Sequence, residues 1–212
     1  LQNDGEYCLA VGNCCLTNAF NTSACFGEAW LRAENKGSIG YIGGTNNTYW
    51  DEDYWWGVGA GSIVVNPTYD GHGPGAYDGM FHDHGETFSD WYTTQYSVIM
   101  AGNLAVVEGG SGMINYYWEI YSLMGDPSLS TFFGVPTVNT VSYPAGMFLG
   151  QTAITLQAEA YSYAGLSMDG ELVAAGLVGS SGSLTLEFDP FSTPGNADLV
   201  ITRQNRQPVM GT

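Results

Sequence analysis

Residues 7–15 have the sequence Tyr7-Cys8-Leu9-Ala10-Val11-Gly12-Asn13-Cys14-Cys15. This apolar run followed by Gly-Asn is typical of a buried strand that leads out into a turn. A thiol at the exit of such a strand is held rigidly near the sheet edge, where open α/β sheets place their reactive groups. Adjacent cysteines rarely bridge each other, because the geometry is strained. At least one thiol of the pair is therefore a candidate for chemistry.

A helix and a second strand are expected directly after this segment. Residues 25–33 have apolar side chains at helical spacing, and Lys36-Gly37 is a suitable end for the helix. Residues 38–43 then form a short apolar run typical of a strand. The order strand, helix, strand predicts a parallel pair joined by a crossover helix.

The character of the chain changes near residue 136. Before it, we expect an aromatic and acidic loop at 44–56, a glycine-rich acidic loop at 66–90, and helices at 91–107 and 114–123. After it, short alternating runs indicate strands separated by turns, and Asp169-Gly170 is a strong hairpin signal. These runs are 153–158, 171–174, 183–188 and 198–202. The second part therefore resembles a small β-sandwich.

Composition excludes several classes of function. The net charge is −17 with four basic residues, a surface that repels nucleic acid and anionic lipid. No apolar run approaches the roughly 20 residues needed to span a bilayer. All four cysteines lie within the first 25 residues, which argues against a disulfide framework and for local chemistry or simple burial.

Eight ordered motifs resemble the gingipains, a family of secreted bacterial cysteine peptidases, and its lysine-specific branch most of all. They are Gly12-Asn13-Cys14-Cys15, Cys25-Phe26-Gly27-Glu28, Tyr41-Ile42-Gly43, Tyr49-Trp50-Asp51-Glu52-Asp53-Tyr54-Trp55-Trp56, Ala101-Gly102-Asn103-Leu104-Ala105, Tyr116-Tyr117-Trp118-Glu119, Gly125-Asp126-Pro127-Ser128 and Val200-Ile201-Thr202-Arg203. The resemblance implies an α/β fold: residues 1–135 as the C-terminal part of a caspase-like catalytic domain, and 136–212 as an all-β immunoglobulin-like sandwich. It also implies a secreted or cell-surface protein that acts on proteins or peptides.

Cys15 matches the nucleophile of this family, whose thiolate attacks a peptide carbonyl and forms an acyl-enzyme. From the residues alone, a buried structural cysteine is an equal alternative. We expect Cys14, Cys8 and Cys25 to lie in the core, Cys14 because side chains alternate along a strand. The family's catalytic His precedes the nucleophile strand, and only six residues do so here. The resemblance therefore implies that an upstream chain or segment supplies the His.

The resemblance also implies a substrate pocket for lysine. Asp53 matches its acidic base, Trp50 an aromatic wall, and Asn13 is a further candidate lining residue. A carboxylate would pair with the lysine ammonium while the ring packs against its methylenes. The alternative is an ordinary surface Asp beside a core Trp.

A calcium site is implied at Glu28 and the carbonyl of Phe20, because Ca²⁺ takes hard oxygen ligands. Alternatively, Glu28 is a first-turn carboxylate that complements the helix dipole.

The histidines suggest two further sites. Gly71-His72-Gly73 resembles a catalytic His-Gly motif but follows Cys15 in the chain, so a solvated glycine-rich loop is the preferred interpretation. His and carboxylate side chains would suit Zn²⁺ or a similar ion, although their spacing matches no known signature and an acidic surface loop is the alternative. They are Asp70, His72, Asp78, His82, Asp83, His84 and Glu86.

A second class of function stays open on the sequence. The chain is also compatible with a non-catalytic surface or adhesion module that keeps the peptidase fold, with aromatic loops and a β-sandwich that bind a partner.

Overall fold

The computed structural model describes residues 2–73, 75–81 and 84–212. The chain divides into two compact units, Leu1–Thr131 and Phe132–Thr212. The first contains helices and strands, and the second contains strands, so the chain as a whole is mixed α/β. Each unit is described by itself.

The first unit is built on a three-stranded sheet in the order β1-β2-β3. β1 (Cys8–Gly12) pairs in parallel with β2 (Ser38–Gly44), which confirms the predicted parallel pair. β3 (Tyr121–Gly125) pairs antiparallel with β2. The expectation that β1 is buried is wrong, because β1 lies at the edge of this sheet and its residues are only partly covered.

The described part of this unit contains six helical segments. The two longest are α2, which is the next element after β2, and α4, which packs against α2. The segments are α1 (Phe26–Leu31), α2 (Trp50–Val58), α3 (Tyr69–His72), the 3₁₀ helix η1 (Phe88–Asp90), α4 (Gln95–Glu108) and α5 (Ile114–Ile120).

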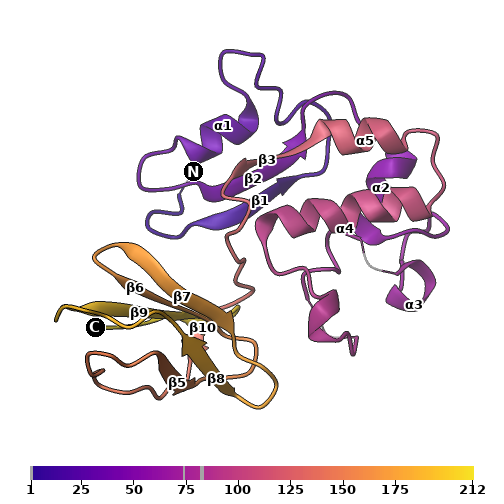
Figure 1. Cartoon of the computed structure of the whole chain (residues 1–212). Coiled ribbons are helices and arrows are strands. Elements are labelled where there is room, and N and C mark those ends of the chain that lie inside the picture. Colours follow the sequence, from indigo (N-terminus) through magenta and orange to yellow (C-terminus); the bar gives the residue numbers. More distant parts are fainter. Residues whose placement is uncertain (1, 74, 82–83) are drawn as a thin grey trace. The chain divides into compact units, whose positions relative to one another are not determined.

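Helices α1 and α4 cover opposite faces of the sheet (Figure 1). The Tyr41 ring on β2 points toward α1, where a Cβ on Gly27 would lie 2.5 Å from it. The neighbouring Gly40 faces the other way, against the Gln95 side chain at the start of α4. Ile42 also faces α4 and joins the apolar core of the unit, which includes Trp56, Ala76, Val98, Ile99, Val106, Tyr117, Ile120 and Tyr121.

The predicted loop at 44–56 is wrong in its second half, because residues 50–58 form helix α2. Its first turn carries three acidic residues, which complement the helix dipole. Trp56 faces inward and is fully buried, stacked on Tyr121 with the ring centroids 4.2 Å apart. For a short segment of this composition, tertiary packing rather than local propensity decides between loop and helix, and the local sequence does not reveal that packing.

Both predicted helices in 91–123 exist with shifted ends. The first begins at Gln95 because Thr94 caps it, exchanging hydrogen bonds with Ser97. The second ends at Ile120, because Tyr121 starts β3 and pairs with Gly44.

The second unit consists of two larger sheets and one short one. The orders are β11-β9-β6-β7, β5-β8 and β10-β4. Core side chains from the two larger sheets, among them Leu156 and Leu186 from one and Leu166 and Ile201 from the other, form one cluster. The strands are β4 (Thr137–Val138), β5 (Ala153–Gln157), β6 (Tyr163–Met168), β7 (Glu171–Leu177), β8 (Ser183–Glu187), β9 (Ala197–Thr202), β10 (Arg206–Gln207) and β11 (Val209–Gly211).

The four predicted strands of this unit are confirmed as β5, β7, β8 and β9. The hairpin signal is confirmed as well, since β6 and β7 pair across Asp169-Gly170 with positive φ at both turn residues, 53° and 83°. β6 itself was not expected, because Ala164 and Gly165 weaken its β propensity. No helix of the described chain is long and apolar enough to span a membrane.

Gly102 on α4 gives a direct test of core packing. A Cβ there would lie 2.5 Å from Nε1 of the buried Trp56. We expect Gly102→Ala to destabilise the first unit by about 1–3 kcal/mol, although Ala is the better helix former. All six tryptophans lie in this unit, so tryptophan fluorescence during denaturant unfolding reports on it.

The matched control is Gly112→Ala, because a Cβ at this exposed position meets no atom within 4 Å. We expect it to change stability by less than about 0.5 kcal/mol. Equal unfolding midpoints for the two variants would contradict this account of the packing.

Candidate active site

Cys15 lies in the turn that follows β1, with its side chain exposed. This turn is fastened to the end of β2: the Leu16 N–H donates to the Asn46 carbonyl at 3.1 Å and the Asn18 N–H to the Gly44 carbonyl at 3.0 Å. The thiol is therefore accessible while its backbone is held in place.

Thr48 makes three contacts with the Cys15 thiol. Its backbone N–H donates to Sγ at 3.2 Å, its hydroxyl oxygen lies 3.5 Å from Sγ, and its carbonyl lies 3.6 Å away. Hydrogen bonds from the Thr48 side chain and backbone lower the pKa of Cys15. A lower pKa increases the fraction of thiolate, which is the nucleophilic form.

The expected core positions of Cys8 and Cys14 are wrong, whereas Cys25 is buried at 6% exposure. Cys8 begins the edge strand β1, and Cys14 comes after β1 has ended at Gly12, so strand alternation does not govern it. Desolvation of the thiol, together with the nearby Asp53 carboxylate, raises the pKa of Cys14. All four thiols are free. Within the adjacent pair, the pKa of Cys14 is raised and that of Cys15 is lowered.

Asp53 accepts hydrogen bonds from three hydroxyl groups. Thr48 donates to Oδ2 at 2.5 Å, while Tyr117 and Tyr121 each donate to Oδ1 at 2.9 Å. Asn13 Nδ2 donates to the Asp53 backbone carbonyl at 2.9 Å. Asn13 Oδ1 is a second acceptor within reach of the Tyr121 hydroxyl, so the one proton of that hydroxyl is shared between Asn13 Oδ1 and Asp53 Oδ1. The structure thus brings three predicted site residues, Cys15, Asp53 and Asn13, into one network.

Three members of this network were missed by sequence reasoning: Thr48, Tyr117 and Tyr121. Tyr117 belongs to one of the motifs that carry the resemblance, but nothing in its pattern indicated a role. Burial, and secondarily the Asp53 charge, raises the pKa of both tyrosines. They therefore stay protonated near neutral pH and serve as donors to the carboxylate.

Trp50 is not brought into this network. It is the first residue of α2, and its side chain is 92% exposed. Its role as the wall of a pocket stays a prediction.

The two predicted calcium ligands are Glu28 at the start of α1 and the carbonyl of Phe20 in the segment before it. Glu28 Oε1 pairs with the Arg32 guanidinium at 2.8 Å, and a cation at this position disfavours a divalent ion. Among the described residues, no three His, Cys, Asp or Glu side chains are grouped to hold a metal. A calcium site built from Glu28 and backbone carbonyls stays a prediction.

The solvated interpretation of His72 is wrong, because His72 is only 7% exposed. Its Nε2 lies 2.7 Å from the Ser62 carbonyl and 3.1 Å from the Tyr54 hydroxyl, and its Nδ1 lies 3.1 Å from the Thr68 carbonyl. Both ring nitrogens are thus engaged in holding the chain around α3.

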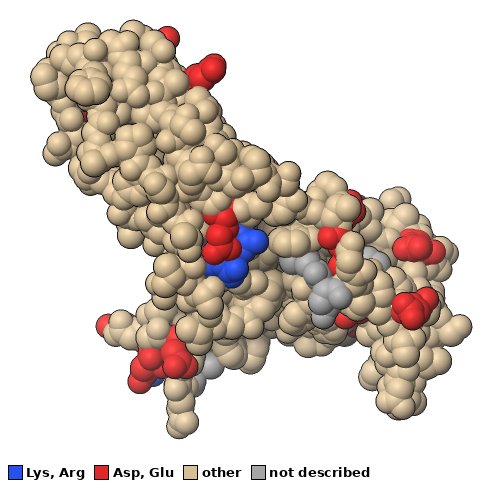
Figure 2. Space-filling view, turned by 90° about the horizontal axis from the view of Figure 1, so that it is seen from below, with Lys and Arg blue, Asp and Glu red and all other residues tan. Residues whose placement is uncertain are grey.

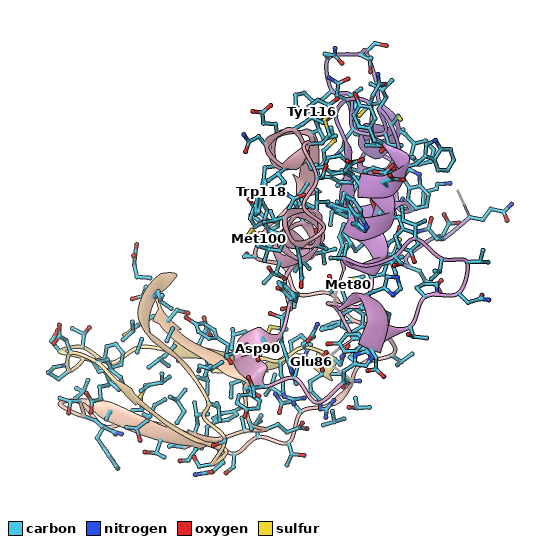
Figure 3. The ribbon with its side chains drawn as sticks, turned by 90° about the vertical axis from the view of Figure 1, so that its right-hand side faces the viewer. Met80, Glu86, Asp90, Met100, Tyr116 and Trp118 are labelled. Carbon is cyan, nitrogen blue, oxygen red and sulfur yellow. The ribbon has the colours of Figure 1, made fainter. Side chains whose placement is uncertain are left out.

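The rest of the predicted His and carboxylate cluster forms no metal site among the described residues. His82 and Asp83 lie outside those residues. His84 pairs with Glu86, Nδ1 to Oε1 at 3.4 Å. Figure 3 shows Glu86 and Asp90 far from Tyr116, which lies on the Cys15 side of the unit, where its hydroxyl donates to the Asn47 carbonyl at 2.9 Å.

The model of peptidase family C25 matches residues 1–132. The chain belongs to peptidase family C25. It is 41% identical over 219 residues to Lys-gingipain of Porphyromonas gingivalis, and 40% identical to Lys-gingipain HG66 of the same species. These alignments cover 99% of this chain and 12% of each relative. The resemblance to gingipains seen in the sequence motifs is confirmed.

Solved structures of proteases share the fold of this chain. A protease structure with 39% identity superposes with a TM-score of 0.90, over 99% of this chain and 47% of that one. The Arg specific cysteine proteinase gingipain R superposes with a TM-score of 0.82 at 22% identity, over 100% of this chain and 46% of that one. At that identity, the second match shows the shared fold alone.

The two adjacent thiols allow an internal comparison of reactivity. Because the pKa of Cys15 is lowered and that of Cys14 is raised, we expect iodoacetamide to label Cys15 first at pH 7. Tandem mass spectrometry of the C25 chain at short labelling times locates the modified residue. Preferential labelling of Cys14 would contradict the assignment of Cys15 as the activated thiol.

Proposed function

We propose that this chain is the C-terminal part of the catalytic domain of a secreted, gingipain-like cysteine endopeptidase, followed by an immunoglobulin-like domain. The main observation in support of this proposal is the arrangement around Thr48, which contacts the exposed Cys15 thiol and the Asp53 carboxylate. A nucleophilic thiol and a carboxylate that contact the same threonine suit cleavage after a lysine residue.

In the proposed reaction, the Cys15 thiolate bonds to the carbonyl carbon of the scissile peptide. The C–N bond then breaks, and the amine leaves with a proton supplied by a general acid, which gives an acyl-enzyme. Water attacks the thioester, releases the acid and restores the thiol. The rigid turn at Cys15 presents its backbone N–H, which by family resemblance stabilises the oxyanion.

Asp53 is the proposed partner of the lysine ammonium. Its three hydrogen-bond donors are neutral hydroxyl groups, so they orient the carboxylate without cancelling its charge. A fixed carboxylate recognises a cation with less loss of side-chain entropy than a mobile one. The network therefore favours a basic side chain next to the scissile bond.

The general base is proposed to come from a segment upstream of this chain. His72 is buried and hydrogen-bonded through both nitrogens, and His84 pairs with Glu86. Within the described sheet, β1 has β2 as its neighbour on one side only. A strand from such a segment could therefore pair along its other edge.

The acidic surface also supports a cationic substrate. Figure 2 shows acidic side chains across the face in view and few basic ones. With a net charge of −17, the protein attracts lysine-rich peptides over a distance that shortens as salt is added.

A lysyl chloromethyl ketone tests the nucleophile. Offered to the intact protein with its upstream segment, it is expected to alkylate Cys15, because the lysine group places the reactive carbon beside the thiol. Labelling is measured by mass spectrometry, and Cys15→Ala is expected to abolish both labelling and peptide cleavage. A folded protein whose Cys15 stays unlabelled would instead support the non-catalytic surface module.

A substitution at Asp53 tests the specificity. We expect Asp53→Asn to lower kcat/KM for lysyl substrates by about 100-fold, because a desolvated cation loses its charged partner. Asp51→Asn is the matched control, since Asp51 is an exposed carboxylate on the same helix, and we expect a change of less than about twofold. Equal effects of the two variants on kcat/KM would argue that Asp53 acts only through general surface charge.

A further inference from the structure

Thr48 stands between the two halves of the proposed site. Its backbone N–H donates to Cys15 Sγ at 3.2 Å, and its hydroxyl donates to Asp53 Oδ2 at 2.5 Å while lying 3.5 Å from the same Sγ. The single side-chain oxygen of Thr48 is thus within reach of both the Cys15 thiol and the Asp53 carboxylate.

The loop that carries Thr48 is held from both sides. The Tyr116 hydroxyl donates to the carbonyl of Asn47 at 2.9 Å, and the N–H of Tyr49 donates to the Tyr117 hydroxyl at 2.9 Å. Thr48 therefore keeps its place when a ligand arrives, and only its hydroxyl proton is free to turn.

That proton cannot serve both neighbours, because a hydroxyl group has one proton and two acceptor lone pairs. At 2.5 Å, Asp53 Oδ2 holds it. A lone pair of the hydroxyl oxygen then faces Sγ, and the Thr48 backbone N–H is left as the hydrogen bond from this residue that stabilises the thiolate. When a cation neutralises Asp53, the proton can rotate toward Sγ and stabilise the thiolate instead.

We propose that the Thr48 hydroxyl couples the two halves of the site, so that a cation bound at Asp53 activates Cys15. Thr48 is thus a positioning residue, and the preferred ligand is a peptide with an alkylammonium side chain before the scissile bond. The inference rests on the proposed role of Asp53. Its consequence is that part of the lysine binding energy is used in the chemical step and appears in kcat, not only in KM.

Other titratable groups near Cys15 are Asp53, Cys14 and Tyr116. Desolvation raises the pKa of both Cys14 and Tyr116, so both are mostly neutral near pH 7. A bound cation also acts on Cys15 directly through space. That direct effect does not need the hydroxyl, so variants that differ only in the hydroxyl isolate the coupling.

The test measures Cys15 alkylation by iodoacetamide as a function of pH in the intact protein. Wild type, Thr48→Ser and Thr48→Val are compared with and without saturating n-butylamine, which mimics the lysine side chain; 1-pentanol is the uncharged control. The thiolate fraction comes from the pH profile, so simple blocking of the site by the amine does not affect it. Tandem mass spectrometry confirms that Cys15 carries the label.

We expect n-butylamine to raise the thiolate fraction, at a fixed pH below the pKa of the thiol, by about 3- to 10-fold in wild type and Thr48→Ser. In Thr48→Val, which keeps the backbone N–H and the shape, we expect less than about twofold. Thr48→Ala supplies a second variant without the hydroxyl. Tryptophan fluorescence verifies folding of each protein.

The outcomes separate the two claims. An equal rise in all variants overturns the coupling and leaves Asp53 as the cation site. No response to the amine in any variant overturns the assignment of Asp53, and the coupling with it. A rise that needs the hydroxyl supports both.

Discussion

The Asp53 carboxylate is the group on which the arrangement of the site depends. Hydroxyl donors reach it from the loop before α2, from α5 and from β3, and Asn13 binds its backbone from the turn after β1. Asp53 is therefore tied to the loop just before its own helix and to two stretches far away in the sequence, the turn after β1 and the α5–β3 segment. A partly buried polar network loses stability when one of its groups is left unsatisfied. These hydrogen bonds therefore favour a single position of the thiol-bearing turn relative to α2.

Much of the first unit could be predicted from sequence. The parallel pair and the helix between its strands followed from hydrophobic periodicity, and the β6–β7 hairpin of the second unit from Asp169-Gly170. Helix α2 could not be predicted this way, because its residues are aromatic and acidic, and packing of Trp56 against α4 determines the conformation. Likewise, Cys14 was placed in the core by a strand alternation that ends two residues earlier, at Gly12.

The site itself was only half visible in the sequence. Resemblance to the gingipains pointed to Cys15, Asp53 and Asn13, and these residues meet in space. The residues that connect them were not visible, because a threonine in a loop and two tyrosines in a core helix and strand have no distinctive local pattern. Their importance comes from the direction of their hydroxyl groups, which depends on the folded backbone. Membership of peptidase family C25 gives this geometry a chemical meaning, although the chain spans only 12% of the length of its Lys-gingipain relatives.

The most direct test of the central claim is the structure of the intact protein after reaction with a lysyl chloromethyl ketone. The account predicts that Cys15 Sγ is bonded to the methylene carbon of the inhibitor and that the lysine ammonium lies within about 3 Å of an Asp53 oxygen. An inhibitor attached to Cys14, or an ammonium group directed into solvent away from Asp53, would contradict it.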